Sequence, residues 1–134
     1  MDCIFCKIIK GNLPALKVYQ DNAVVAFLDI APISPGHLLV VPRQHAADLL
    51  AIDDLALAYV MRVAKQLGRA MIKGLGADGF NVGINNGAVA GQVIEHFHCH
   101  VIPRFKNDGL KDWPAREYEP GQSEQLAAKL KAAL

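Results

Sequence analysis

One long amphipathic stretch, residues 53 to 74, constrains the fold of this chain more than any other feature. Asp53 or Asp54 can cap a helix at its start, and Gly74 can cap it at its end. The apolar residues between them recur at helical spacing: Leu57, Val60, Ala64, Leu67 and Met71. The basic residues fall on other faces: Arg62, Lys65, Arg69 and Lys73. The pattern predicts one long helix whose single apolar face packs on another element.

Short apolar runs separated by turn residues make up most of the remaining chain. They predict strands at 18–20, 23–28, 37–41, 80–85 and 97–102. Asp21 and Asn22 predict a hairpin turn between the first two strands, and the run at 37–41 is apolar enough for burial on both faces. A short C-terminal helix is predicted from Ser123. We therefore expect an α+β domain, a mostly antiparallel sheet of about five strands with the long helix against it.

Composition narrows the class of protein. The chain has 134 residues, 52% of them apolar, with a formal net charge of +1, and we expect one domain spanning 1–134. Charges of both signs are scattered, which argues against a nucleic-acid partner. No apolar run reaches the roughly 20 residues that span a bilayer, and the first residues do not resemble a signal peptide. With three cysteines and no disulfide pattern, these features predict a cytoplasmic protein without a membrane partner.

Three histidines, His96, His98 and His100, alternate along the last predicted strand. On a strand they share one face, with neighbours about 6 to 7 Å apart and the outer two about 13 Å apart. One zinc ion can take two of them, but that span is too long for all three, since Zn–N bonds are about 2 Å long. A single histidine on a half-buried strand is usually just a hydrogen-bonded polar residue. Three in strict alternation, among five histidines in all, favour a functional site.

A division of labour among the histidines suits transfer of a phosphoryl or nucleotidyl group. A neutral imidazole is a competent nucleophile when its other nitrogen is held as N–H, and a flanking imidazole, if protonated, can bind an anion. Such reactions depend chiefly on positioning and on stabilising charge at the phosphate oxygens. The loop before the histidines offers donors from Asn85, Gln92 and the backbone near Gly91. Each of these residues alone is more often simple turn chemistry.

The segment HFHCHVI, residues 96–102, resembles the His-x-His-x-His-x-x signature of the histidine triad (HIT) family. Three longer segments also resemble the family, in family order: IFCKIIKGNLPALKVYQDN, VVAFLDIAPISPGHLLVVPRQH and NNGAVAGQVIEHFHCHVIPR. Together they cover most of residues 3 to 104. The resemblance implies a HIT-like fold, a homodimer, and a nucleotide hydrolase or transferase that acts at the α-phosphate, with purine nucleotides as substrates. It implies no organic cofactor.

Site roles follow from the resemblance position by position. His98 would be the nucleophile that forms a nucleotidyl-histidine intermediate, oriented by the backbone carbonyl of His96. His100 would bind the phosphate, and His37 would lie on the proton path. The nucleotide would be held by the remaining matched residues: Gln92 and Asn85 at the phosphate, Asp29 at the ribose hydroxyls, and Phe5, Phe27 and Ile30 around the base. Without the resemblance, the two phenylalanines would be interpreted as core and Asp29 as a loop residue.

Three alternatives remain open at this point. Val93 occupies a position where the phosphoramidase branch of the family usually has a serine near the leaving group, so a dinucleoside polyphosphate or another nucleotide ester is a rival to an AMP-amidate substrate. A protein that binds nucleotides without turnover is a second alternative, and a hydrolase with an open catalytic zinc is a third.

Trp113 and Pro114 loosely resemble the C-terminal segment that approaches the neighbouring subunit in the phosphoramidase branch.

Cys3 and Cys6 form a CxxC motif, which can supply half of a tetrahedral zinc site. Bacterial HIT proteins with this motif look similar, and that resemblance implies His45 and His96 as the other two ligands of a structural Zn²⁺. The alternative is a pair of small buried thiols without metal. Cys99, on the face opposite the histidines, is expected to lie in the core.

Overall fold

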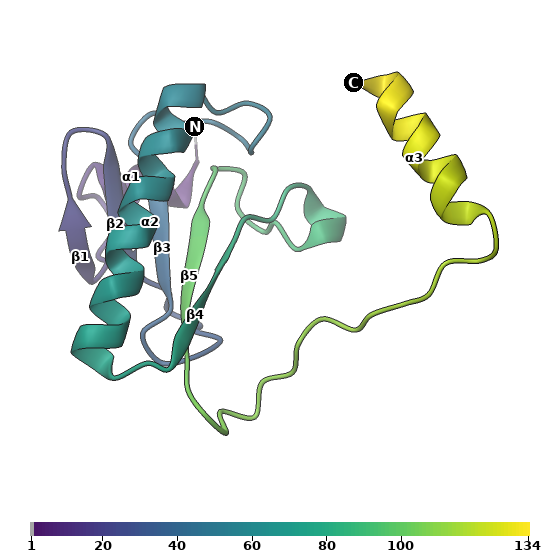
Figure 1. The fold of residues 1–134 in the computed structure, drawn as a ribbon. Helices are drawn as coiled ribbons and strands as arrows, with labels where there is room; N and C mark the ends of the chain where they lie inside the picture. Colours follow the sequence, from purple (N-terminus) through teal and green to yellow (C-terminus); the bar gives the residue numbers. More distant parts are fainter. Residues whose placement is uncertain (1) are drawn as a thin grey trace.

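The computed structural model describes residues 2–134 and contains one five-stranded sheet with helices on both faces (Figure 1). The elements follow in the order α1 (Ile4–Ile9), β1 (Lys17–Gln20), β2 (Val24–Leu28), β3 (Leu38–Pro42), α2 (Asp54–Leu75), β4 (Gly79–Gly83), the 3₁₀ turn η1 (Ala88–Ala90), β5 (Cys99–Arg104) and α3 (Gln122–Ala133). The strand order is β1-β2-β3-β5-β4, and each neighbouring pair is antiparallel. The predicted α+β class, with one long helix and a short C-terminal helix, is confirmed.

Helix α2 begins as predicted, because the Asp53 side chain accepts hydrogen bonds from the backbone N–H groups of Leu55 and Ala56. It ends two residues later than predicted, at Gly76 rather than Gly74. Gly76 has a φ of 68°, the left-handed conformation that glycine adopts without strain, and its N–H bonds back to the carbonyl of Met71. The apolar face of α2 is buried against β2, β3 and β5, together with Cys99 as expected.

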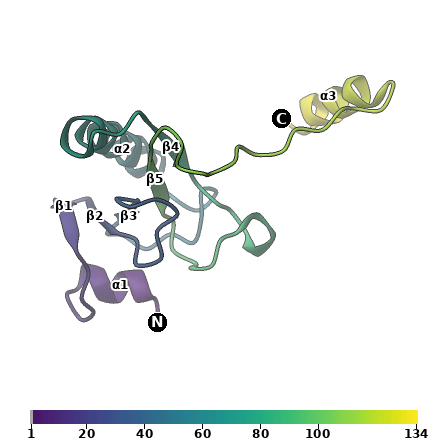
Figure 2. The ribbon, with the colours of Figure 1, turned by 90° about the horizontal axis from the view of Figure 1, so that it is seen from below.

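The opposite face of the sheet is covered by α1, a helix that the sequence did not predict (Figure 2). Six residues are too few to show helical periodicity. Phe5 and Ile8 point from α1 into a second apolar cluster with residues of β2 and β3: Val25, Phe27, Leu39 and Val41. Strand β3 is therefore buried on both faces, as its sequence predicted.

The last strand starts later than predicted, at Cys99 instead of residue 97, so His96 and His98 precede it in an irregular segment. The reason is a competing hydrogen bond, since the Phe97 N–H bonds to the Ala46 carbonyl at 2.7 Å in the loop after β3. The side chains of residues 97–100 nonetheless alternate between the two faces of the sheet. Phe97 packs in the α2 cluster, whereas His100 pairs with Leu39, whose side chain belongs to the α1 face. Strand β4 also stops earlier than predicted, at Gly83 rather than residue 85.

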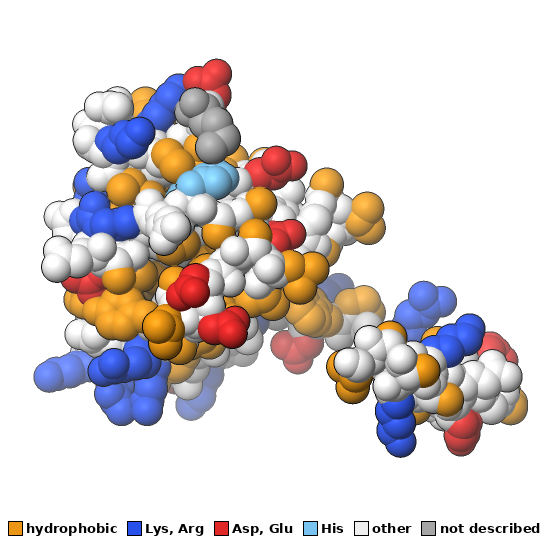
Figure 3. All heavy atoms as spheres, turned by 90° about the horizontal axis from the view of Figure 1, so that it is seen from above, with side chains coloured by type: hydrophobic (Ala, Val, Ile, Leu, Met, Phe, Trp, Pro, Cys, Tyr) orange, Lys and Arg blue, Asp and Glu red, His pale blue; other side chains and the backbone are white. Residues whose placement is uncertain are grey.

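The C-terminal segment leaves the body after β5 and carries α3 away from it (Figures 1 and 3). Its apolar side chains are open to solvent, with Trp113 94% exposed. Charged side chains of both signs are spread over the face drawn in Figure 3. Of the helices in residues 2–134, none is both long and apolar enough to cross a membrane.

Candidate active site and metal-binding cluster

His98 lies at the junction between the irregular segment and β5, with only 7% of its surface exposed. Its Nδ1 lies 2.7 Å from the backbone carbonyl oxygen of His96. A carbonyl can only accept, so Nδ1 carries the proton and Nε2 of the neutral ring carries the lone pair. Phe5 and His98 meet edge to face, with ring centroids 5.1 Å apart. The histidine is thus held in one tautomer and one orientation.

His37 lies immediately before β3 and is hydrogen-bonded to His100 on β5. The Ile33 N–H donates to Nδ1 of His37 at 3.1 Å, so the proton of this buried ring sits on Nε2. That Nε2 donates to Nδ1 of His100 at 2.9 Å. The proton of a neutral His100 must therefore sit on its own Nε2. Among residues 2–134, His100 Nε2 is the buried side-chain nitrogen or oxygen that has no hydrogen-bond partner.

Both linked imidazoles are neutral near pH 7. Burial, with the neighbouring His98 and His37 rings, lowers the pKa of His100 to about 4. Burial also lowers the pKa of His37, although the Asp29 carboxylate opposes that shift. The sequence interpretation allowed for a protonated flanking imidazole. In this structure His100 instead offers a neutral N–H donor that meets no acceptor among residues 2–134.

Asp29, His37 and His100 also bring three potential ligand atoms within 4.8 Å of one another. The hydrogen-bond pattern argues against a metal ion there. His37 would have to coordinate through Nε2, which carries its proton as long as the Ile33 N–H occupies Nδ1. A metal would therefore cost the Ile33 hydrogen bond, and the geometry favours the histidine pair as a donor chain over an open catalytic metal.

The residues predicted to bind the nucleoside differ in how close they lie to the His37 and His100 pair. Asp29 follows β2, and its Oδ2 lies 3.8 Å from Nε2 of His37, while its Oδ1 accepts from the Ala31 N–H. Phe5 and Phe27 meet edge to face at 5.5 Å and are almost fully buried. Ile30 is fully exposed. The structure thus gathers Asp29, Phe5 and Phe27 around the histidines and leaves Ile30 at an open rim.

The loop from Asn85 to Gln92 is tied together by the side chains that were predicted to contact phosphate. Gln92 Nε2 donates to the carbonyls of Ala47 and Ile94, and its Oε1 accepts from the Gly87 N–H. Asn85 Nδ2 lies 3.5 Å from the Gly91 carbonyl. Both amide hydrogens of Gln92 are therefore engaged in holding the loop in this arrangement. Val93, next along the chain, is 87% exposed.

A cleft of about 580 Å³ opens beside His100 on the β4 side of the sheet. Gly83 pairs with His100 across the two strands, and its lack of a side chain leaves open space there. The cleft is lined further out by polar, cationic and aromatic groups: Asn81, Asn85, Arg104, Lys111 and Trp113. If His98 and His100 contact a phosphate group, this cleft can accept the part of the ligand that is attached to that phosphate.

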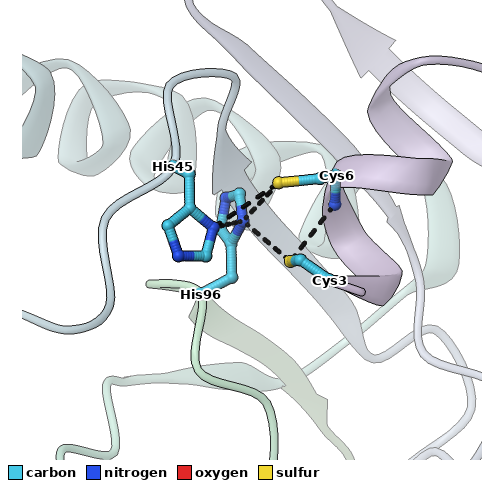
Figure 4. A group of neighbouring side chains, drawn as sticks. All are labelled: Cys3, Cys6, His45 and His96. Atoms are coloured by element: carbon cyan, nitrogen blue, oxygen red, sulfur yellow. Dashed lines mark hydrogen bonds between the residues drawn. The ribbon is translucent and has the colours of Figure 1, made fainter. Parts of the chain in front are cut away.

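A second cluster brings Cys3 and Cys6 of the α1 region together with His45 and His96 (Figure 4). Nδ1 of His96 lies 3.1 Å from Nδ1 of His45, 3.4 Å from the Cys3 Sγ and 3.6 Å from the Cys6 Sγ. A tetrahedral zinc ion would place its ligand atoms about 3.3 Å (N to N) and about 3.5 Å (N to S) apart. The distances from His96 to the other three predicted ligands are thus close to those of a zinc site, and all four ligand atoms lie within 4.8 Å of one another.

The tautomer of His96 fits the same role. Its Nε2 lies 2.9 Å from the Pro42 carbonyl and must donate to it, which leaves the lone pair on Nδ1, facing the two sulfurs and His45. Metal-bound histidines commonly donate their second nitrogen to a carbonyl in this way. The donor set of two sulfurs and two imidazoles is typical of a closed structural zinc site.

The orienting partners of the histidines were absent from the sequence prediction, except for the His96 carbonyl. Ile33 orients His37 through its backbone N–H, and Pro42 orients His96 through its backbone C=O. Any residue type offers these groups, so the sequence holds no signal for them beyond the family resemblance.

The comparison with known families agrees with this geometry. The family model described as "HIT domain" matches residues 10–107. The chain belongs to the histidine triad family. Several relatives of this HIT protein carry named activities. An adenosine 5'-monophosphoramidase of Schizosaccharomyces pombe is 38% identical over 98% of this chain and 100% of the relative. An adenylylsulfatase of Arabidopsis thaliana is 43% identical over 81% of this chain and 55% of the relative.

Solved HIT structures share the whole fold. A member of the family from Bacillus subtilis superimposes with a TM-score of 0.90 at 34% identity, covering 100% of this chain and 98% of the other. A zinc-bound histidine triad protein of Mycobacterium smegmatis gives a TM-score of 0.80 at 36% identity, covering 100% and 99%.

Proposed function

We propose that this HIT protein hydrolyses an AMP conjugate at its α-phosphate, through a nucleotidyl intermediate on His98, with purine nucleotide amidates as the substrate class. The observation that carries the proposal is the pairing of two fixed tautomers. The His96 carbonyl leaves a lone pair on His98 Nε2, and the His37 bond leaves an unused N–H on His100 Nε2. A nucleophile beside an unpartnered donor suits attack at a phosphate.

In the first step, Nε2 of His98 attacks the α-phosphorus, an N–P bond forms, and the P–N bond to the leaving amine breaks. The leaving amine takes a proton from solvent water in the open cleft, and the attacking water of the second step returns a proton to solvent. His100 Nε2–H donates to a phosphate oxygen and stabilises the charge that the transition state spreads over these oxygens. In the second step, water attacks phosphorus, the His98–P bond breaks, and AMP leaves. His37 fixes the His100 tautomer and lies where a proton can pass between the rings.

The nucleoside would lie toward α1 and the end of β2. Asp29 would accept hydrogen bonds from the ribose hydroxyls, as its carboxylate is 21% exposed and has capacity for two donors. Phe5 and Phe27 would form the inner wall for the base and Ile30 the outer rim. Asn85 would contact the phosphate region, and Gln92 would do so by giving up one loop hydrogen bond.

A dinucleoside polyphosphate remains the second candidate. Val93 offers no hydroxyl to protonate an amine, and this favours a leaving group that needs no proton. The charges of the cleft do not separate the two candidates, because Lys111 is accompanied by Asp112 and Arg104 is paired with Asp108. The substrates differ in what this cleft must accept, so they can be separated by measurement.

The test is a panel of AMP-linked substrates, with amidates set against diadenosine polyphosphates, assayed with wild type and with His98→Ala. We expect faster turnover of one class by the wild type and a loss of at least about a thousandfold in the variant, because the covalent route is removed. AMP binding by His98→Ala should persist. If the wild type binds AMP but turns over neither substrate class, the protein is a nucleotide-binding protein and the enzymatic proposal is refuted.

We also propose a structural Zn²⁺ at Cys3, Cys6, His45 and His96. The interatomic distances, the His96 tautomer and the zinc-bound relative support it. Such an ion would join α1 to the loops before β5 and after β3, because its ligands come from these three segments.

A homodimer is proposed as the working assembly. Strand β4 is a free edge, and Phe80 on it packs against α2 at Gly68. Around this edge several apolar side chains are more than a third exposed: Met61, Ile72, Leu75, Phe80 and Val82. A second copy would cover this surface and give the projecting C-terminal segment a body to pack on.

A further inference from the structure

We propose that the Cys3, Cys6, His45 and His96 cluster positions the His98 nucleophile, so that metal binding supports the chemical step as well as the fold. This inference rests on the proposed function of His98. Two separate contacts connect the cluster to the His98 ring, one through the backbone of His96 and one through the side chain of Phe5.

The first contact runs through a single residue with two roles. His96 turns its ring into the cluster, where Nδ1 faces both sulfurs, and its Nε2 donates to the Pro42 carbonyl. The carbonyl of the same residue accepts the 2.7 Å hydrogen bond from Nδ1 of His98. A ring held at both nitrogens restricts rotation of residue 96, and that restriction keeps its carbonyl aimed at His98. Loss of the anchor frees the carbonyl to turn and the His98 tautomer to change.

The second contact runs through the turn of helix between the two cysteines. Phe5 lies between Cys3 and Cys6 in sequence, and its ring meets His98 at 5.1 Å and His96 at 5.9 Å between centroids. A six-residue helix is too short to be stable by itself, so α1 depends on what it is attached to. Ligation by both cysteines would fix the turn that holds Phe5 against the His98 ring.

The coupling should act on the covalent step more than on nucleotide affinity. His37 and His100 take their orientation from Ile33 and from each other, and Asp29 takes its orientation from the Ala31 N–H. Within residues 2–134, these hydrogen bonds involve no residue of the cysteine cluster. Metal removal should therefore lower kcat roughly ten- to hundredfold, the usual effect of losing an orienting shell, and change AMP affinity less, through Phe5 at the proposed base site alone.

The first experiment observes the His98 hydrogen bond directly. The Nδ1–H resonance of His98 is assigned by its absence from the His98→Ala spectrum and followed by NMR in zinc-loaded, chelator-treated and reloaded protein. We expect a slowly exchanging signal in the loaded protein, its loss on chelation, and its return on reloading. An unchanged signal in folded, zinc-free protein would overturn the coupling, whatever the substrate of the enzyme proves to be.

The second experiment uses kinetics and keeps the metal in place. Phe5→Leu is compared with Ile8→Val, a substitution in the same helix and the same apolar cluster. Both variants should retain one zinc per chain, while kcat at saturating substrate falls only in Phe5→Leu. The Kd for AMP should stay unchanged in Ile8→Val and can rise in Phe5→Leu, because Phe5 also borders the proposed base site, so kcat is the deciding value. Equal kcat values at full zinc content would contradict the Phe5 contact, even if chelation were to unfold the wild type. Absence of turnover in the loaded wild type would refute the proposed function, and the NMR result would still decide the coupling.

Discussion

The Nε2 atom of His37 lies 2.9 Å from Nδ1 of His100, and this bond determines which nitrogen of His100 is left to face a substrate. Because the Ile33 N–H occupies the other nitrogen of His37, the direction of the bond is fixed, with His37 as donor. The consequence is a neutral His100 whose free N–H lies on the nitrogen away from His37 and has no acceptor in the described part of the chain, residues 2–134. A backbone N–H on a loop thus sets the protonation pattern two rings away.

Replacement of His37 tests this chain of tautomers. His37→Ala removes the donor to Nδ1 of His100, so the His100 proton can move to the wrong nitrogen and kcat/KM should fall roughly ten- to hundredfold, the cost of one unmet buried hydrogen bond. His37→Gln is the matched control, since its amide N–H can replace the imidazole donor and should restore much of the activity. Equal losses in both variants would show that His37 acts through its titration or its bulk instead.

The low pKa of His100, about 4, predicts how stability depends on pH. The unfolded chain binds a proton to this residue near pH 6.5, whereas the folded chain does not. Between those values the unfolded state holds more protons, so stability falls as the pH is lowered from about 6.5 toward 4. His100→Asn keeps an acceptor for His37 and removes this titration. Urea unfolding at pH 7.5 and pH 5 should show a smaller loss for the variant, and an equal loss would contradict the shifted pKa.

The larger elements could be predicted from the sequence because their patterns are long or have clear caps. Helix α2 has an Asp53 cap and a long apolar periodicity, and strand β3 is a continuous apolar run that ends at Pro42. Helix α1 was missed because its six residues contain two core positions, Phe5 and Ile8, and its start is marked only by the sulfur of Cys3, which accepts from the Cys6 N–H. Cysteine is not a residue that capping preferences identify.

The site could be predicted only in part, because the sequence shows which face a side chain takes but not which backbone groups it meets. Alternation correctly separated Phe97 and Cys99 from the histidines, although the strand begins only at Cys99. The direction of each imidazole could not be predicted, because it depends on backbone groups contributed by segments far along the chain. The loop bonds of Gln92 are a further example, since the amide that was matched to a phosphate contact is engaged with Ala47 and Ile94.

Zinc content provides an independent test of the cysteine cluster. Elemental analysis of protein prepared with ample zinc should give one zinc per chain for the wild type and much less for Cys3→Ser and His45→Ala, because each substitution removes a ligand. The variants should also melt at a lower temperature, since ligation joins three segments and metal binding adds to the free energy of folding. Cys99→Ser, which alters a buried cysteine outside the cluster, should retain its zinc. A wild type without zinc would exclude the site.

The β4 edge predicts the effect of one surface charge on assembly. Phe80→Glu places a carboxylate in the apolar surface beside α2 and should weaken the dimer by about 2 kcal/mol or more, roughly thirtyfold in Kd. Sedimentation equilibrium measures this change. Lys17→Glu, on exposed β1 at the opposite edge of the sheet, serves as the control and should leave the Kd unchanged. A wild type that stays monomeric at high concentration would contradict the proposed dimer.

Asp29 is placed to serve either the ribose or His37, and substrate hydroxyls can separate these roles. Its Oδ2 lies 3.8 Å from Nε2 of His37, while Oδ1 is held by the Ala31 N–H, an acceptor that Asp29→Asn preserves. If the carboxylate binds the ribose, the substitution should raise KM about tenfold for an adenosine substrate, since a charged hydrogen bond contributes about 1.5 kcal/mol or more. The 2',3'-dideoxy substrate should lose little, because it has no hydroxyls to present. A similar loss with both substrates, seen in kcat rather than KM, would instead assign Asp29 to the His37 and His100 pair, where its charge favours a proton on His37 during the reaction.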